Sequence, residues 1–229
     1  MKNSNTKYIH DNFIEKEIIL SHFGIDEKNF DELIEAKIIP GPSYTFEISR
    51  KITSTLNDSI TENYTEEYFS KNTVVLIDKY LKSNFSFEYG KSNFREKFKK
   101  ILTNHENKEF AYNNIFKTTG IDEAKFDENF EDEWDFYING GYGICTLNAT
   151  EQEIVEKEIV VKKIMKLYND SLNRDLNDEE IKELISLDIQ FNKVAALFAP
   201  YQRINSSRGK YLDQLLKKNN LEERIKNYE

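Results

Sequence analysis

The last third of the chain carries two helix start signals, and they constrain the fold more than any other sequence feature. Thr150 is followed three residues later by Glu153, and Asn177 by Glu180, which is the spacing of a capping box at a helix N-terminus. Apolar residues recur at helical spacing after both signals, until Pro200 interrupts the second segment. We therefore expect two long amphipathic helices, over residues 150–168 and 177–198.

The N-terminal region predicts a helix-turn-helix-like unit. Two short helices flank the turn Gly24-Ile25-Asp26, where Asp26 is placed to cap the second helix. That helix ends before Pro40-Gly41-Pro42, and residues 44–52 alternate weakly, as a strand pair in the position of a wing would. The same turn recurs at Gly120-Ile121-Asp122, and residues 120–128 match residues 24–32 at seven of nine positions. The repeat is either a duplicated subdomain or one capped turn used twice.

The middle of the chain has three further helical patterns. They cover residues 65–82, 92–103 and 122–138, with a loop over 83–90. The third should stop at Gly140-Gly141 and be followed by a short extended piece. A last helix should begin at Ser206 or Ser207.

These patterns together predict a mainly α, multi-helix globular protein with one or two short β hairpins. We expect a helix-turn-helix-like region over residues 1–90 and a helical domain over residues 91–229. No low-complexity linker separates them, so a single domain is the alternative.

The charge, the apolar runs and the cysteine count limit which partners the protein can bind and in which compartment it is expected. A formal charge of −9 argues against nucleic acid, because phosphate contacts dominate that affinity. No apolar run approaches the roughly 20 residues that span a bilayer. The single cysteine excludes an internal disulfide and suits a reducing compartment. We therefore expect a cytoplasmic protein without a membrane segment; its oligomeric state stays open.

Rare residues gather in three short pieces, which mark the candidate site. The only Trp, the only Cys and three of the eight Gly lie between residues 134 and 145, and one of the three Pro lies in the segment 198–203. The third piece is Ser206-Ser207-Arg208. The candidate ligand- or partner-binding residues in these pieces are Trp134, Asp135, Tyr137, Tyr142, Cys145, Tyr201, Arg203, Ser206, Ser207 and Arg208.

The three pieces resemble an uncharacterised bacterial family, a domain of unknown function with the pattern W-D-x-Y-[LI]-x-G-x-Y-G-[VI]-C, then F-A-P-Y-x-R, then S-S-R. The Pro-x-Pro-Ser-Tyr segment at residues 40–44 is part of the resemblance. Some members are labelled in connection with natural-product biosynthesis, so the resemblance implies a role of that kind without a known reaction. This chain departs from the pattern at Gln202, where Asp is expected, and at Gly141, where a larger residue is usual.

The Arg/Ser segment after residue 201 has two interpretations. Arg203 and Arg208 near a helix start are typical of a site for carboxylate or phosphate. Alternatively, both arginines pair with the acidic run 122–135, which holds eight acidic residues and one Lys. Cys145 is either a nucleophile or, more commonly for an isolated cysteine, buried and unreactive. We expect no metal and no cofactor.

Two functional hypotheses follow, with a regulator as a third. The first is a non-catalytic binding or accessory protein that engages a protein, a peptide or an anionic small molecule. The second is an enzyme of unfamiliar type acting on an anionic small molecule or peptide, built on Asp135, Tyr137, Cys145, Tyr201 and Arg203. A DNA-binding regulator is disfavoured because the candidate recognition helix is acidic.

Overall fold

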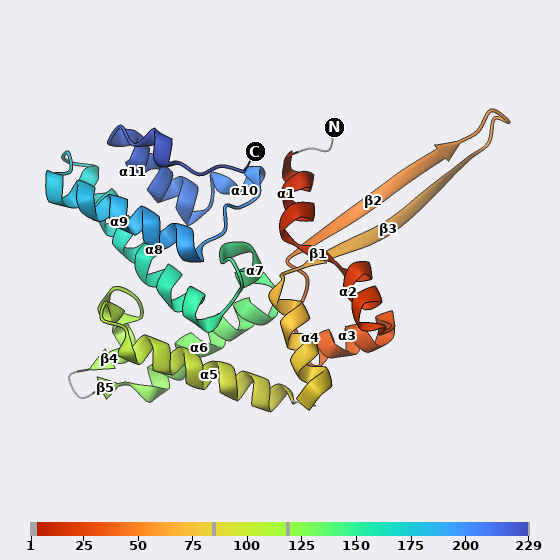
Figure 1. Ribbon diagram of the computed structural model, residues 1–229, viewed down its shortest axis with the longest axis horizontal. Helices are drawn as coiled ribbons and strands as arrows, with labels where there is room; N and C mark the ends of the chain where they lie inside the picture. The colour runs from red at the N-terminus through yellow and green to blue at the C-terminus, as the bar shows by residue number, and fades with distance from the viewer. Residues whose placement is uncertain (1–3, 84–85, 118–119, 229) are drawn as a thin grey trace.

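The computed structural model describes residues 4–83, 86–117 and 120–228. The protein is mainly helical, as predicted, with a long β hairpin projecting from the body (Figure 1). Within the described residues, no helix combines the length and the apolar composition needed to cross a membrane.

The N-terminal elements are α1 (Ser4–Asn12), β1 (Ile14–Glu15), α2 (Lys16–Phe23), α3 (Glu27–Glu35), β2 (Tyr44–Thr53) and β3 (Ser59–Phe69). The three strands form an antiparallel sheet in the order β1-β3-β2. This order of helices and strands is that of a winged helix, with β2 and β3 as the wing. The predicted turn is confirmed: Gly24 is left-handed, and Asp26 accepts a hydrogen bond from the Asn29 N–H at 2.8 Å.

The prediction of a helix over residues 65–82 is wrong at its start. Residues 65–69 belong to β3 and pair with β2 and β1, and the helix α4 covers only Asn72–Ser83. Pairing with strands distant in the sequence outweighs the local helical spacing.

The helix α5 (Phe87–Asn104) begins earlier than predicted, because Ser86 caps it by accepting from the Tyr89 N–H. Residues 87–90 are therefore helical and not part of a loop, while residues 84–85 lie outside the described residues.

The second copy of the turn differs from the first. Gly120-Ile121 forms strand β5, which pairs with β4 (Phe116–Lys117), so a strand and not a helix precedes the turn. Asp122 makes no side-chain cap; its carboxylate lies 2.6 Å from the Lys117 ammonium. The sequence match therefore does not extend to a second helix-turn-helix.

The acidic helix α6 (Glu123–Ile138) ends as predicted before Gly140. The expected extended piece after it is wrong, because Gly141–Cys145 forms the short helix α7. Gly140 adopts a left-handed conformation that reverses the chain between the two helices. Only Thr146 is extended enough to bridge Ala195.

The C-terminal helices are α8 (Glu151–Ser171), α9 (Asp178–Val194), α10 (Pro200–Arg203), a π-helical turn over Arg208–Leu212, and α11 (Asp213–Lys218). Asn177 and Glu180 form the predicted capping box of α9. Thr150 caps α8, but Glu153 binds the backbone and side chain of Asn148 instead of closing a box.

The end of α9 differs from the prediction. The helix stops at Val194, Phe198 has a positive φ of 66°, and Pro200 begins α10 instead of ending α9. Proline suits the first turn of a helix because its missing N–H has no intrahelical acceptor there. The last helix does begin after Ser206, whose Oγ accepts from the Gly209 N–H at 3.2 Å.

Two apolar clusters fill the helical region. One joins α5, α6 and the start of α8 around Phe94, Phe130 and Trp134, and the other joins α8, α9 and α11. A further cluster packs Tyr8, Phe13, Tyr44 and Tyr68 of the N-terminal unit against Ala199. The two ends of the chain therefore share a core.

Candidate functional site

The segments that carry the family resemblance meet in space. The Gly41 N–H donates to the Ile138 carbonyl at 2.8 Å, and Ser43 Oγ donates to the Gly140 carbonyl at 2.9 Å. Tyr44 Oη donates to Gln202 Oε1 at 2.6 Å. The Pro-x-Pro-Ser-Tyr segment thus docks on both C-terminal motifs.

Close approach explains two of the glycines. A Cβ on Gly140 would lie 2.6 Å from the Gly41 carbonyl oxygen, and one on Gly143 would lie 2.3 Å from Ser43 Oγ. A Cβ on Gly141, the departure from the resemblance pattern, would lie 2.5 Å from the ring of Phe136. A side chain at any of these positions would displace a neighbour.

Arg203 is held inside the protein. Its Nε and Nη2 donate to the Asp213 carboxylate at 2.8 and 2.9 Å, and its Nη1 donates to the Leu197 and Lys226 carbonyls. The guanidinium of Arg203 therefore connects α10, α11 and the C-terminal segment.

Arg208 is buried, with 1% of its surface exposed. Its guanidinium donates to the Ala195 and Ala196 carbonyls just after α9 and to Asn192 Oδ1 at 2.7 Å, and it lies over the Phe191 ring. Burial, and after it the charge of Arg203, lower the pKa of Arg208 to about 10. The predicted pairing of the two arginines with the acidic run 122–135 is wrong, because both have partners elsewhere.

The remaining candidate residues of the Arg/Ser segment make local backbone contacts or lie at the surface. Ser206 Oγ donates to the Arg203 carbonyl at 2.7 Å, and Ser207 is half-buried next to it. Tyr201 is exposed on α10, where its backbone N–H donates to Asn5 Oδ1 at 3.0 Å.

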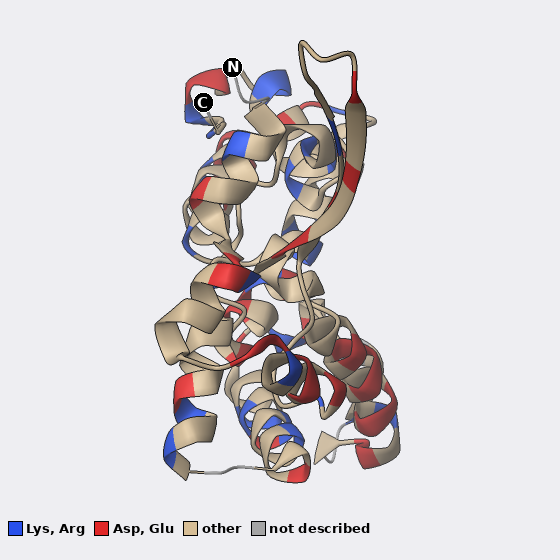
Figure 2. Cartoon of the chain, turned by 90° about the vertical axis from the view of Figure 1, so that its right-hand side faces the viewer, with Lys and Arg blue, Asp and Glu red and all other residues tan. Residues whose placement is uncertain are grey.

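The acidic run is instead balanced by α5. Lys91 pairs with Glu131 and Lys99 with Glu123, each at 2.5 Å, and Arg95 Nε donates to Asp127 at 2.9 Å. Figure 2 shows a strongly acidic helix at the lower right of the view, with basic residues on the helix beside it. The charges of this face are therefore matched across two helices of the same chain.

Buried tyrosines hold a carboxylate behind α7. Tyr112 Oη and Tyr142 Oη both donate to Glu133. Burial raises the pKa of Glu133 to about 7, although the Tyr112 hydrogen bond favours the charged form. Burial also raises the pKa of the Cys145 thiol. Asp135 is exposed on the outer side of α6, apart from these buried groups.

The exposed side of α3 is acidic. Glu27, Asp31, Glu32 and Glu35 lie along it, and Lys16 of α2 holds the first two at 3.0 and 2.8 Å. This is the helix that a DNA-binding winged helix would place in the major groove. Its carboxylates would face phosphate there.

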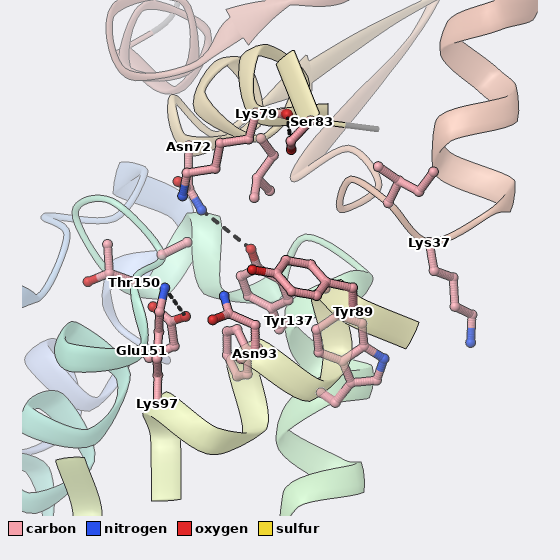
Figure 3. Close-up of a pocket in the computed structure, with 16 residues that line it drawn as sticks. Lys37, Asn72, Lys79, Ser83, Tyr89, Asn93, Lys97, Tyr137, Thr150 and Glu151 are labelled. Atoms are coloured by element: carbon pink, nitrogen blue, oxygen red, sulfur yellow. Dashed lines mark hydrogen bonds and ion pairs between the residues drawn. The ribbon is translucent and has the colours of Figure 1, made fainter. Parts of the chain in front are cut away.

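A cavity of about 420 Å³ is enclosed by α4, by the residues just after α3, and by the helices α5, α6 and α8. Phe94, Trp134 and Tyr137 form its buried part. Asn72 donates to Tyr137 Oη at 3.4 Å across the pocket, as Figure 3 shows. The size is within the range of small-molecule pockets, about 300–1,000 Å³.

Three lysines and one carboxylate line this pocket. Lys97 lies 3.5 Å from Glu151, which stands at the start of α8. Lys37 and Lys79 form no ion pair with any residue in the described ranges 4–83, 86–117 and 120–228. The side chains that line the pocket thus carry an excess of two positive charges in a chain of net charge −9.

Lys37 also has an unusual backbone. Its φ is 53°, in the left-handed position just after α3, where the Ile38 N–H donates back to the Leu33 carbonyl at 2.9 Å. Glycine is the common residue at this position of a helix end. A lysine there accepts backbone strain, and its exposed side chain extends outward from the rim of the pocket (Figure 3).

Residues 90–220, more than half of the chain, match a family of unknown function (DUF6058). The chain belongs to this family. The match agrees with the resemblance to an uncharacterised domain. No curated protein and no solved structure matches the chain.

The family region supplies one wall of the pocket. Trp134 and Tyr137 lie within the residues that match DUF6058, whereas Lys37, Asn72 and Lys79 come before them. Sequence analysis missed the latter three, because nothing local distinguishes them from other polar residues. Among the described residues, no group of three or more His, Cys, Asp or Glu is arranged to hold a metal ion.

Proposed function

We propose that the protein is a non-catalytic binding protein whose pocket takes an anionic small molecule with an apolar or aromatic part. The observation that carries the proposal is a basic rim over an aromatic interior. Lys37 and Lys79 supply positive charge and pair with no acidic group among the described residues, and Trp134 supplies a large apolar surface.

The charge balance supports an anionic ligand over a cationic or neutral one. Opposite charges in a concave, partly desolvated site attract more strongly than on an open surface. Asn72, Asn93 and Thr150 add uncharged donors that can orient a carboxylate or a carbonyl.

Binding without chemistry is favoured over the enzyme hypothesis by the arrangement of the candidate catalytic residues. Tyr137 lines the pocket, but Asp135 and Tyr201 are exposed elsewhere, and Arg203 is committed to Asp213. A role as an accessory protein in natural-product biosynthesis is part of the proposal and rests on the family resemblance alone.

Calorimetric titration with a matched pair of probes tests the proposal. The anion 4-phenylbutyrate and its neutral amide share shape and apolar area and differ in charge. We expect the carboxylate to bind and the amide to bind at least tenfold more weakly, since one well-placed charge interaction is worth about 1.4 kcal/mol. Equal affinities for the two probes, or no heat with either, would contradict the proposal.

Two lysine variants localise the binding. Lys37→Gly relieves the strain of the left-handed backbone, so it should raise the free energy of unfolding by about 1 kcal/mol. The same variant should weaken the binding of 4-phenylbutyrate. Lys79→Gln should also lower the affinity for 4-phenylbutyrate. The control is Lys193→Gln, an exposed position on α9 away from the pocket, which should leave the affinity unchanged.

A further inference from the structure

The wing is a two-stranded hairpin without cover. Strands β2 and β3 pair over ten residue positions, a length of about 34 Å, and extend away from the helical body (Figure 1). Every residue from 49 to 65 is exposed. An isolated two-stranded hairpin is marginally stable in water, and further strands stabilise it.

The two faces of the hairpin differ in chemistry. Even-numbered positions carry an apolar series, and the odd-numbered positions of the opposite face are polar throughout. The apolar series is Phe46, Ile48, Ile52, Ile60 and Tyr64, and it is interrupted by the facing pair Arg50 and Glu62 and by Glu66 opposite Phe46. Ile52 and Ile60 face each other with 44% and 59% of their surfaces exposed.

The outer edge of β2 has free backbone groups. It is the edge strand of the sheet order β1-β3-β2. The Ser54 N–H donates to the Asp58 carbonyl at 3.2 Å, so the alternation of an antiparallel ladder turns the backbone groups of the odd-numbered residues of β2 outward. Ser49 lies at the centre of this outward series.

The β2 sequence is complementary to itself about Ser49. In an antiparallel pairing of two β2 strands centred there, Glu47 lies opposite Lys51 of the second copy, and this contact occurs twice. Thr45 lies opposite Thr53, and Phe46 opposite Ile52. Opposite charges and apolar pairs facing each other stabilise neighbouring strands, whereas like charges directly opposite destabilise them.

The outer edge of β3 lacks this complementarity. It carries Glu62, Glu66 and Glu67 and no basic residue, and Glu67 is held by Lys16 at 3.4 Å. Two β3 strands would bring acidic residues together. Because the hairpin projects, pairing through β2 keeps the two bodies, each of net charge −9, apart.

We propose that β2 is a dimerisation edge: two copies of the chain pair antiparallel through residues 45–53, with the two-fold axis at Ser49, and form a four-stranded sheet. The contact is isologous, so it closes at two copies. The apolar faces of both hairpins then form one continuous surface on the same side of this sheet.

Sedimentation analysis of the full chain with a charge exchange tests the register. Wild type is expected to show a concentration-dependent monomer–dimer equilibrium. Glu47→Lys and Lys51→Glu each place like charges opposite each other twice and should weaken the dimer at least tenfold. The double variant, with both changes, restores opposite charges and should return to within about threefold of wild type.

A proline pair separates the edge contact from folding. Ser49→Pro removes an outward N–H from β2 and should abolish the dimer, whereas Asn63→Pro, at the facing position on the outer edge of β3, should leave it intact. Circular dichroism checks that both variants fold. A monomeric wild type, a double variant as weak as the single ones, or growth beyond a dimer through β2–β3 pairing would overturn the proposal.

Discussion

At the scale of single residues, Arg208 shows how a motif residue can serve the core. Its guanidinium has no carboxylate within hydrogen-bonding distance among the described residues. It donates hydrogen bonds to two carbonyl oxygens after α9 and to the amide oxygen of Asn192. Asn192 in turn donates to Asp188, which also binds Arg224. The buried charge is thus stabilised by oriented dipoles and by a carboxylate one step away.

Replacing Arg208 with Met should cost about 3 kcal/mol or more of unfolding free energy, because Asn192 and two carbonyls lose their donors in a buried place. Urea denaturation measures the cost. The matched control is Arg174→Met, which breaks the more exposed pair with Glu180 and should cost much less than Arg208→Met, because solvent screens an exposed ion pair. Equal costs for the two variants would show that burial of Arg208 carries no special penalty.

Glu133 makes folding stability depend on pH. Burial raises its pKa from the ordinary 4.5 to about 7, so the folded state holds a proton that the unfolded state releases between these values. The contribution of Glu133 to stability is therefore full below pH 4.5 and decreases as the pH rises toward 7. A neutral side chain of the same shape, which does not titrate, would not show this decrease.

The variant Glu133→Gln tests this sign. The difference in unfolding free energy, wild type minus variant, should fall by about 2–3 kcal/mol between pH 4.5 and pH 8. Urea denaturation at the two pH values measures it, and the contributions of other titrating groups cancel in the difference. A difference that stays constant or grows with pH would contradict the assignment.

At the scale of elements, the junction between α6 and α7 joins the two halves of the protein. Gly140→Ala should cost about 3 kcal/mol or more, because the new methyl group meets the Gly41 and Pro42 carbonyl oxygens at 2.6 and 2.8 Å. Gly24→Ala is the matched control: Gly24 is also left-handed, with φ 62°, but nothing lies within 4 Å of its added Cβ.

Only the backbone strain, about 1 kcal/mol, should appear at Gly24. Thermal or urea unfolding of both variants measures the excess at Gly140. If both substitutions cost the same, the close docking of residues 41–42 contributes nothing to stability.

Elements whose signals are local could be predicted from the sequence. The helices α6, α8 and α9 were predicted at their starts because Asp122, Thr150 and Asn177 stand at the N-cap position with periodic apolar residues after them. The strand β3 was missed because its pairing partner, β2, specifies it. Likewise, the end of α9 depends on the bridge from Thr146 to Ala195, which no local pattern indicates.

The candidate site was predicted only in part, for the same reason. Trp134 and Tyr137 stood out as rare or motif residues and do line the pocket. Lys37, which lies just after α3, and Lys79 of α4 are brought to the pocket by tertiary packing. Arg203 and Arg208 stood out equally as motif residues. Their side chains donate hydrogen bonds to Asp213 and to backbone carbonyls inside the protein, and the sequence alone does not distinguish this role from ligand binding.

At the scale of the whole molecule, the pocket lies between the family region and the elements that precede it, which supply Lys37, Asn72 and Lys79. Tyr8 and Tyr44 pack with Ala199, and Ser43 binds the Gly140 carbonyl, so both pocket walls are fixed relative to each other. A ligand that contacts both walls stabilises the folded protein by linkage, in proportion to its affinity and concentration. The winged helix and the family region are thereby coupled through the site.

The fluorescence emission of Trp134 tests directly whether the pocket binds an anion, because Trp134 is the only tryptophan of the chain and lies in the pocket. We expect 4-phenylbutyrate to change its emission saturably, 4-phenylbutanamide to do so at least tenfold more weakly, and Lys79→Gln to shift the midpoint to higher concentration. An emission that neither probe changes at concentrations up to several millimolar, or that both change alike in wild type and Lys79→Gln, would contradict an anion-binding pocket.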